Sequence, residues 1–181
     1  MTNDFPVTRH TIDCLERWLE ILAKPLLPPQ RVQEQDGAFH WEFNEQTPRA
    51  LQVGKAVRMI SGIRAALLLA DLGHTVECFS LLRIVSEFAQ EIFAIAEALL
   101  EKRFTEPQER FVQQYFAPLA RNADEFEQQE RERYVSREEL FKAQYRLDEK
   151  VIGDPGRLRK LSRFVNYTYD KYVHGAYLTA M

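Results

Sequence analysis

Two long apolar segments separated by a very short turn constrain the fold of this chain more than any other feature. The first begins at Thr47-Pro48, a helix cap followed by proline in the first turn, and ends at Gly73. The second begins at Thr75 and continues to about Arg103. Because the turn is so short, we expect the two helices to form an antiparallel hairpin roughly 35 to 40 Å long.

The N-terminal part of the chain predicts one more helix, followed by an irregular connector. In TIDCLERWLEILAK, residues 11–24, apolar side chains recur every three or four positions, and the pattern stops at Pro25. These apolar positions are Ile12, Leu15, Trp18, Leu19 and Leu22. Residues 25–47 hold three of the eight prolines and a brief alternation, FHWEF, that suits a short strand or an arm. We interpret this stretch as a connector within one domain.

The C-terminal part also has helical patterns. Thr105 caps a helix that Pro118 is expected to kink, and its polar far end, residues 124–133, is typical of a solvated helix end. SREE at 136–139 is a capping-box pattern for a short helix, and a last helix begins at Pro155. We therefore expect an all-α, single-domain bundle of about five or six helices, built on the long central hairpin.

Helical phase predicts which faces of the hairpin are buried. In the helix that begins at Thr75, apolar side chains occupy about half of the circumference, and polar side chains share the other half. The polar half contains Arg83, Glu87, Gln90, Glu97 and Glu101. The preceding helix is apolar almost all round, which indicates neighbours on most sides.

Arg64 is a lone charge within that apolar helix. Counting back from the turn places Arg64 roughly level with Arg83 and one turn from Glu87. We therefore expect a buried ion pair between Arg64 and either Glu87 or Glu91. The alternative is that this arginine and a carboxylate face a ligand cavity.

Composition and charge argue against several classes of protein. The formal net charge is -3 and the pI is near 5.9, whereas nucleic-acid-coating and membrane-surface proteins need a long-range positive field. The N-terminal sequence has no export signal, and the richest apolar run, AALLLA, is too short to span a bilayer. Cys14 and Cys78 lie far apart, without a metal-binding pattern. We expect a cytoplasmic protein with no membrane association.

Motifs for metal ions, cofactors and nucleophiles are missing from the sequence. A di-metal bundle needs two Glu-x-x-His motifs, and the chain has none. Phosphate-binding glycine loops, zinc helices and nucleophile elbows are also missing. His10, His40 and His74 lie near expected element ends, where capping or solvent contact is the simplest role. We expect no metal and no cofactor.

The last helix is the one place where the sequence hints at chemistry. His174 lies on the side of this helix opposite its apolar arc, one turn after Asp170 and beside Lys171. Asp170 could orient the imidazole or raise its pKa. Three interpretations stay open: an exposed polar stripe, the wall of a functional cleft, and a structural bond between histidine and carboxylate.

A basic cluster, RLRKLSR at 157–163, opens the same helix. Four cations without an intervening acid favour a local contact with phosphate or RNA, although a solvated helix surface is an equally ordinary interpretation. They are Arg157, Arg159, Lys160 and Arg163. Lys171 is a further phosphate-contacting cation on our reading, without the bidentate fork of an arginine.

The combination of LLRIVSE at 81–87 with the late YDKYVHG at 169–175 resembles an uncharacterised bacterial family of helical proteins that is similar to HEPN domains. The resemblance covers roughly residues 50–175 and implies a nucleotide-binding or RNA-cleaving bundle of a toxin or phage-defence system, with His174 as its catalytic residue. HEPN nucleases carry an Arg, four to six residues, and then His. Here Arg163 precedes His174 by eleven positions, about 16 Å along one helix, which argues against RNA cleavage.

Two classes of function follow. The first is a non-enzymatic helical module that binds a protein partner or forms a homodimer. The second is a HEPN-like, metal-independent ribonuclease or RNA-binding protein, in which His174 acts as a general acid or base. We favour the first, because the sequence lacks a complete catalytic constellation.

Overall fold

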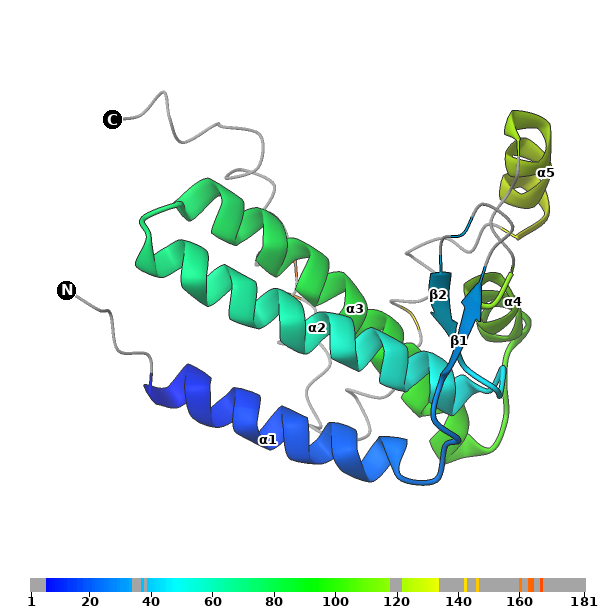
Figure 1. Ribbon diagram of the computed structural model, residues 1–181, viewed down its shortest axis with the longest axis horizontal. Coiled ribbons are helices and arrows are strands. Elements are labelled where there is room, and N and C mark those ends of the chain that lie inside the picture. The colour runs from blue at the N-terminus through cyan, green and yellow to red at the C-terminus, as the bar shows by residue number, and fades with distance from the viewer. Residues whose placement is uncertain are drawn as a thin grey trace.

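The computed structural model describes residues 6–33, 37, 39–117 and 122–133, together with residues 142, 146, 160, 163, 164 and 167. It confirms the all-α fold class: the described part of the chain forms five helices and one two-stranded sheet. Figure 1 shows the helices α2 and α3 lying side by side in the middle of the molecule, with α1 along one side of α2 and α5 projecting at the far end.

The central pair consists of α2 (Pro48–Asp71) and α3 (Thr75–Glu101), which run antiparallel (Figure 1). As predicted, α2 begins with a Thr47 cap: the Thr47 hydroxyl accepts a hydrogen bond from the backbone N–H of Ala50 at 3.2 Å. Gly73 adopts φ +80° between the helices, a conformation that glycine reaches without a steric penalty. The backbone N–H of His74 then bonds the Leu69 carbonyl at 2.8 Å, which closes the turn.

Two glycines in α2 allow neighbouring helices to approach it closely. A Cβ atom at Gly62 would lie 2.7 Å from Cγ2 of Val85 on α3. A Cβ atom at Gly54 would overlap the hydroxyl of Tyr115 on α4 (Glu106–Tyr115). Both positions are therefore contact points at which a side chain would push the helices apart.

The core lies where α2, α3 and α4 meet. Its buried members are Leu51 of α2, Ala94 and Ile95 of α3, and Phe111 of α4. Partly buried side chains pack around this core; they are Phe104, Val112, Tyr115 and Phe116. Burial of these aromatic and aliphatic groups holds α4 across the end of the hairpin.

The predicted cap of α4 is confirmed, whereas Pro118, where a kink was predicted, lies outside the described residues. Both the backbone N–H and the hydroxyl of Thr105 donate to Oε1 of Gln108 at 2.9 Å. The helix ends at Tyr115, and a separate helix, α5 (Ala123–Arg133), follows. The single helix expected from Thr105 to residue 133 is therefore interrupted after Tyr115.

The N-terminal connector forms a small antiparallel hairpin of β1 (Gln30–Gln33) and β2 (Phe39–Glu42). Arg31 is level with Trp41, and its guanidinium lies 3.9 Å above the centre of the Phe39 ring. Outside the ladder, the Asn44 amide donates to the Pro28 carbonyl at 2.6 Å and fixes the base of the hairpin. The FHWEF alternation thus forms a short strand, which is one of the two predicted alternatives.

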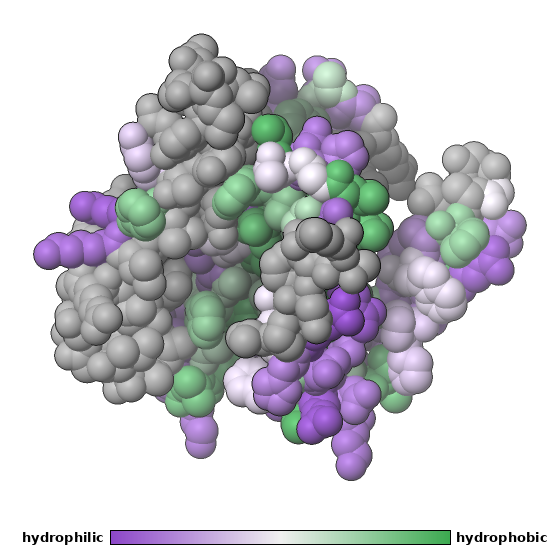
Figure 2. Space-filling view, turned by 90° about the vertical axis from the view of Figure 1, so that its left-hand side faces the viewer, coloured by the Kyte–Doolittle hydropathy of each residue, from purple (hydrophilic) through white to green (hydrophobic). Residues whose placement is uncertain are grey.

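Apolar side chains remain at the surface of the central pair. Leu68 and Leu72, near the turn between α2 and α3, are exposed. Figure 2 looks at the end of the molecule that carries this turn and shows apolar side chains at the surface among hydrophilic ones. Within the described part of the chain, neighbouring elements therefore cover the apolar surface of α2 only in part.

Candidate interaction surface

One face of α1 (Pro6–Ala23) packs against α2. Ile12 is buried in this contact, and Leu15, Leu19 and Leu22 are partly buried beside it. An ion pair between Glu16 of α1 and Arg64 of α2 joins the two helices at the same face. The contact fixes the rotation of α1 about its own axis and so decides which of its residues face outward.

Four residues on the opposite side of α1 form what we call the outer stripe: His10, Cys14, Trp18 and Ile21. At about 100° of rotation per residue, they fall within roughly 80° of one another and opposite Ile12. The exposed fractions of Trp18 and Ile21 are 69% and 70%. Sγ of Cys14 lies 3.7 Å from Nε2 of His10. The outer stripe is thus a continuous, largely apolar ridge in solvent.

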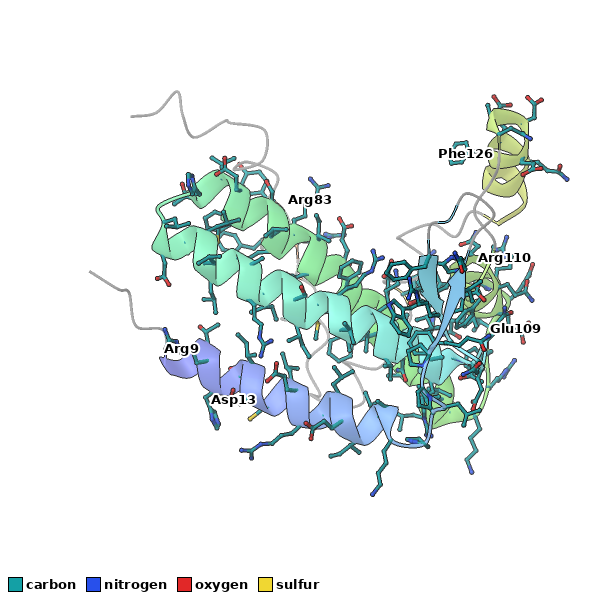
Figure 3. All side chains as sticks on the ribbon, viewed as in Figure 1. Arg9, Asp13, Arg83, Glu109, Arg110 and Phe126 are labelled. Carbon is teal, nitrogen blue, oxygen red and sulfur yellow. The ribbon has the colours of Figure 1, made fainter. Side chains whose placement is uncertain are left out.

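Charged side chains of alternating sign run along one flank of the outer stripe. They are Arg9, Asp13, Arg17 and Glu20, all exposed, and we call them the flanking charges. Figure 3 labels the first two, at the N-terminal end of α1. Two cations and two carboxylates sum to zero, so this flank has no net field for nucleic acid or an anionic membrane.

The ion pair predicted for Arg64 is wrong in its partner and in its burial. Arg64 pairs with Glu16 on α1, and its side chain is 60% exposed. Glu87 pairs with Arg83 of its own helix, Nε to Oε1 3.5 Å, and Figure 3 shows Arg83 extending from α3. Glu91 pairs with Lys55 at 2.8 Å. The prediction failed because α1 was not considered as the neighbour of α2.

Lys55 and Glu91 form the most enclosed ion pair between the central helices. Their side chains are 15% and 21% exposed, and Nζ of Lys55 also lies 5.1 to 5.8 Å from the centres of three aromatic rings. The rings belong to Phe88, Phe111 and Tyr115. A cation that is paired with one carboxylate and lies near three aromatic rings joins α2, α3 and α4, which is typical of a structural cluster.

Tyr115 closes this cluster from α4. Burial raises the pKa of its hydroxyl; the nearby positive charge of Arg58 lowers it, and the carboxylate of Glu91 raises it again. A phenol with a raised pKa stays protonated at neutral pH, so it is unsuited to act as a base. The Tyr115 ring lies 5.4 Å from Nζ of Lys55, so α4 contributes to the surroundings of the ion pair.

A second enclosed carboxylate, Glu97, was predicted on the solvent side of α3 but is buried, as is Gln90. Nε and an Nη atom of Arg146 donate to the two Glu97 oxygens at 2.8 and 3.0 Å. Gln108 donates to Glu97 at 3.3 Å and to the Ala94 carbonyl at 2.8 Å. Because these donors satisfy both carboxylate oxygens, Glu97 can be buried with its charge.

The residues predicted to contact or cleave RNA fall almost entirely outside the described part of the chain. His174, Lys171, Arg157 and Arg159 lie outside it. Arg163 is described, helical and exposed, and Lys160 of the same cluster is exposed as well. The ribonuclease alternative and the phosphate-binding cluster therefore stay predictions.

No group of three or more His, Cys, Asp or Glu side chains among the described residues is arranged to hold a metal ion. None of the helices that the structure describes is long and apolar enough to cross a membrane.

Sequence reasoning missed the outer stripe because it assigned Trp18 to the apolar positions of an amphipathic helix. A signal was nevertheless present: Cys14, Trp18 and Ile21 are spaced at four and three residues, the spacing of a second apolar face. With apolar side chains on both sides of α1, only its contact with α2 determines which face is covered.

Comparison with known proteins adds no further assignment. No family model, curated protein or solved structure matches this chain.

Proposed function

We propose that this protein is a non-enzymatic self-association module, in which two copies of the chain pair through the outer stripe of α1. The observation that carries this proposal is the exposure of Trp18 and Ile21 on the side of α1 that faces away from α2. Tryptophan is the side chain most enriched at the energetic centre of interfaces, and its removal from water favours association.

A second copy of the chain is the binding partner that matches the flanking charges. Nucleic acid and anionic membranes require a positive surface, whereas the flanking charges sum to zero. A protein helix with charges of both signs can instead pair each cation with a carboxylate. This chain carries such a helix itself, and pairing of identical surfaces closes at two copies around a two-fold axis.

Sedimentation equilibrium over a concentration series tests the proposal. From about 1 µM to about 1 mM, the range over which small interfaces dissociate, we expect the mass of the protein to rise from 21.3 kDa toward twice that value. Trp18→Glu should raise the dissociation constant at least about 30-fold, because a carboxylate would be buried at the centre of the interface.

Trp41→Glu is the matched control, since Trp41 is an equally exposed tryptophan on β2. This variant should associate as the unchanged protein does. Circular dichroism should show the same helix content in both variants. A monomer at every concentration would overturn the proposal, as would equal effects of Trp18→Glu and Trp41→Glu.

A further inference from the structure

We infer that the two copies pair with their α1 helices antiparallel, with the two-fold axis beside residue 15, and that the flanking charges select this arrangement. The inference rests on the self-association proposed above and adds its orientation, its register and the residues that determine its specificity.

The order of the flanking charges favours an antiparallel pair. Read from the N-terminus, Arg9, Asp13, Arg17 and Glu20 are positive, negative, positive and negative. Reversing the direction of a second α1 inverts this order, so that each cation meets a carboxylate. In a parallel pair the two-fold axis would run along the helices and place the two charged flanks on opposite sides of the interface, so these charges could not pair with one another.

The same charges determine the register. In an antiparallel pair, Asp13 is level with Arg17 of the partner subunit when the axis passes at residue 15. Arg9 is level with Glu20 of the partner subunit when the axis passes half a residue earlier. The two positions of the axis differ by less than 1 Å, because the helix rises 1.5 Å per residue. Both ion pairs therefore form in one register, and each occurs twice because of the symmetry.

The outer stripe interdigitates in this register. Trp18 comes level with position 12 of the second helix, midway between the partner subunit's His10 and the partner subunit's Cys14 along the outer stripe. Cys14 comes level with position 16, midway between Cys14 and Trp18 of the partner subunit. Side chains of one helix thus face gaps of the other, as helix packing requires.

Cys14 supplies a direct readout, because it lies one residue from the axis. Its two copies are about 3 Å apart along the helices, and for interaxial distances of about 8 to 10 Å their Cα atoms are about 5 Å apart. This distance is within the range of a disulfide. The other cysteine, Cys78, is buried in α3 and does not reach the outer surface.

The first experiment measures dimer dissociation constants of charge-reversed variants by sedimentation. Asp13→Arg and Arg17→Asp should each weaken the dimer at least about 10-fold, because each places like charges together twice. The combined variant exchanges the two charges, so positions 13 and 17 again carry opposite signs where the two subunits meet, and its dissociation constant should return to within about 3-fold of the original. An equimolar mixture of the two single variants should form a heterodimer in preference to either homodimer.

The second experiment uses oxidative cross-linking with copper phenanthroline and oxygen. The unchanged chain should form a covalent dimer, which Cys14→Ser should abolish. The combined variant Cys14→Ser/Ile21→Cys tests orientation: in the antiparallel pair the two copies of position 21 are about 18 Å apart along the axis and should not cross-link. In a parallel pair they would be level.

The outcomes separate the inference from the proposal beneath it. A monomeric unchanged chain would refute self-association itself. A dimer that tolerates Asp13→Arg, or that cross-links through position 21, would leave self-association standing and overturn the antiparallel arrangement.

Discussion

Nζ of Lys55 lies 2.8 Å from Oε2 of Glu91, which joins α2 to α3 beside the aromatic side chains of α4. Both side chains are mostly enclosed, so the two charges depend on each other: either one left alone would be a poorly solvated charge.

Removing one partner of this ion pair should destabilise the fold strongly, because the remaining charge is left without its partner. Removing both charges should therefore cost less than the sum of the two single losses. We expect Glu91→Gln and Lys55→Met each to lower the free energy of unfolding by about 2 kcal/mol, less than for fully buried pairs because water still reaches this pair. The double variant should lose at least about 1 kcal/mol less than the sum of the single losses. Urea unfolding of the four proteins measures this difference, and strictly additive losses would contradict the coupling.

Gly54→Ala should destabilise the protein, although alanine favours helices by about 1 kcal/mol over glycine. The new methyl group would overlap the Tyr115 hydroxyl, and overpacking of this kind costs typically about 1 to 3 kcal/mol. In a Tyr115→Phe background the hydroxyl is gone, so the same change should be neutral or stabilising. Thermal unfolding of both pairs of proteins tests the contact; an equal effect in the two backgrounds would exclude it.

Lys102→Gly should stabilise the protein by about 1 kcal/mol. Lys102 ends α3 at φ 52°, in the left-handed region, where a side chain is sterically unfavourable and glycine is not. Lys102→Ala is the control, because alanine keeps the Cβ atom and should give no comparable gain. The midpoints of denaturant unfolding measure both changes in stability, provided that the slope of free energy against denaturant concentration is constant. A greater gain from alanine than from glycine would indicate that the left-handed conformation is not the cause.

Tyr115 should ionise at a higher pH than a tyrosine in an unfolded chain. Its pKa is raised in the folded protein, so the unfolded chain releases this proton first, and the stability of the fold should fall as the pH rises above about 10. Absorbance at alkaline pH follows tyrosine ionisation, and Tyr115→Phe should remove one transition that lies above the pH at which an unfolded chain ionises. The pH dependence of unfolding should also become shallower in Tyr115→Phe; an unchanged profile would show that another group is responsible.

Helix boundaries near the central hairpin were predictable because they depend on local chemistry. Thr47 and Pro48 begin α2, Gly73 permits the turn, and Thr105 begins α4, each through contacts within a few residues of the chain. The end of α4 shows the limit of such reasoning even at short range: one helix was expected to continue from Thr105 to residue 133, but α4 ends at Tyr115 and α5 begins at Ala123.

The sequence by itself determined where helices begin and end, because caps, turns and helical periodicity act over a few neighbouring residues. Only the tertiary structure decided which charges pair and which faces are covered. Arg64 meets Glu16 because α1 lies against α2, and Glu97 is buried because Arg146 and Gln108 satisfy its oxygens. Periodicity gave α1 two apolar faces, and packing against α2 left the face with Trp18 in solvent. Helical phase specifies which residues share a face, but what covers that face depends on parts of the chain far away in sequence.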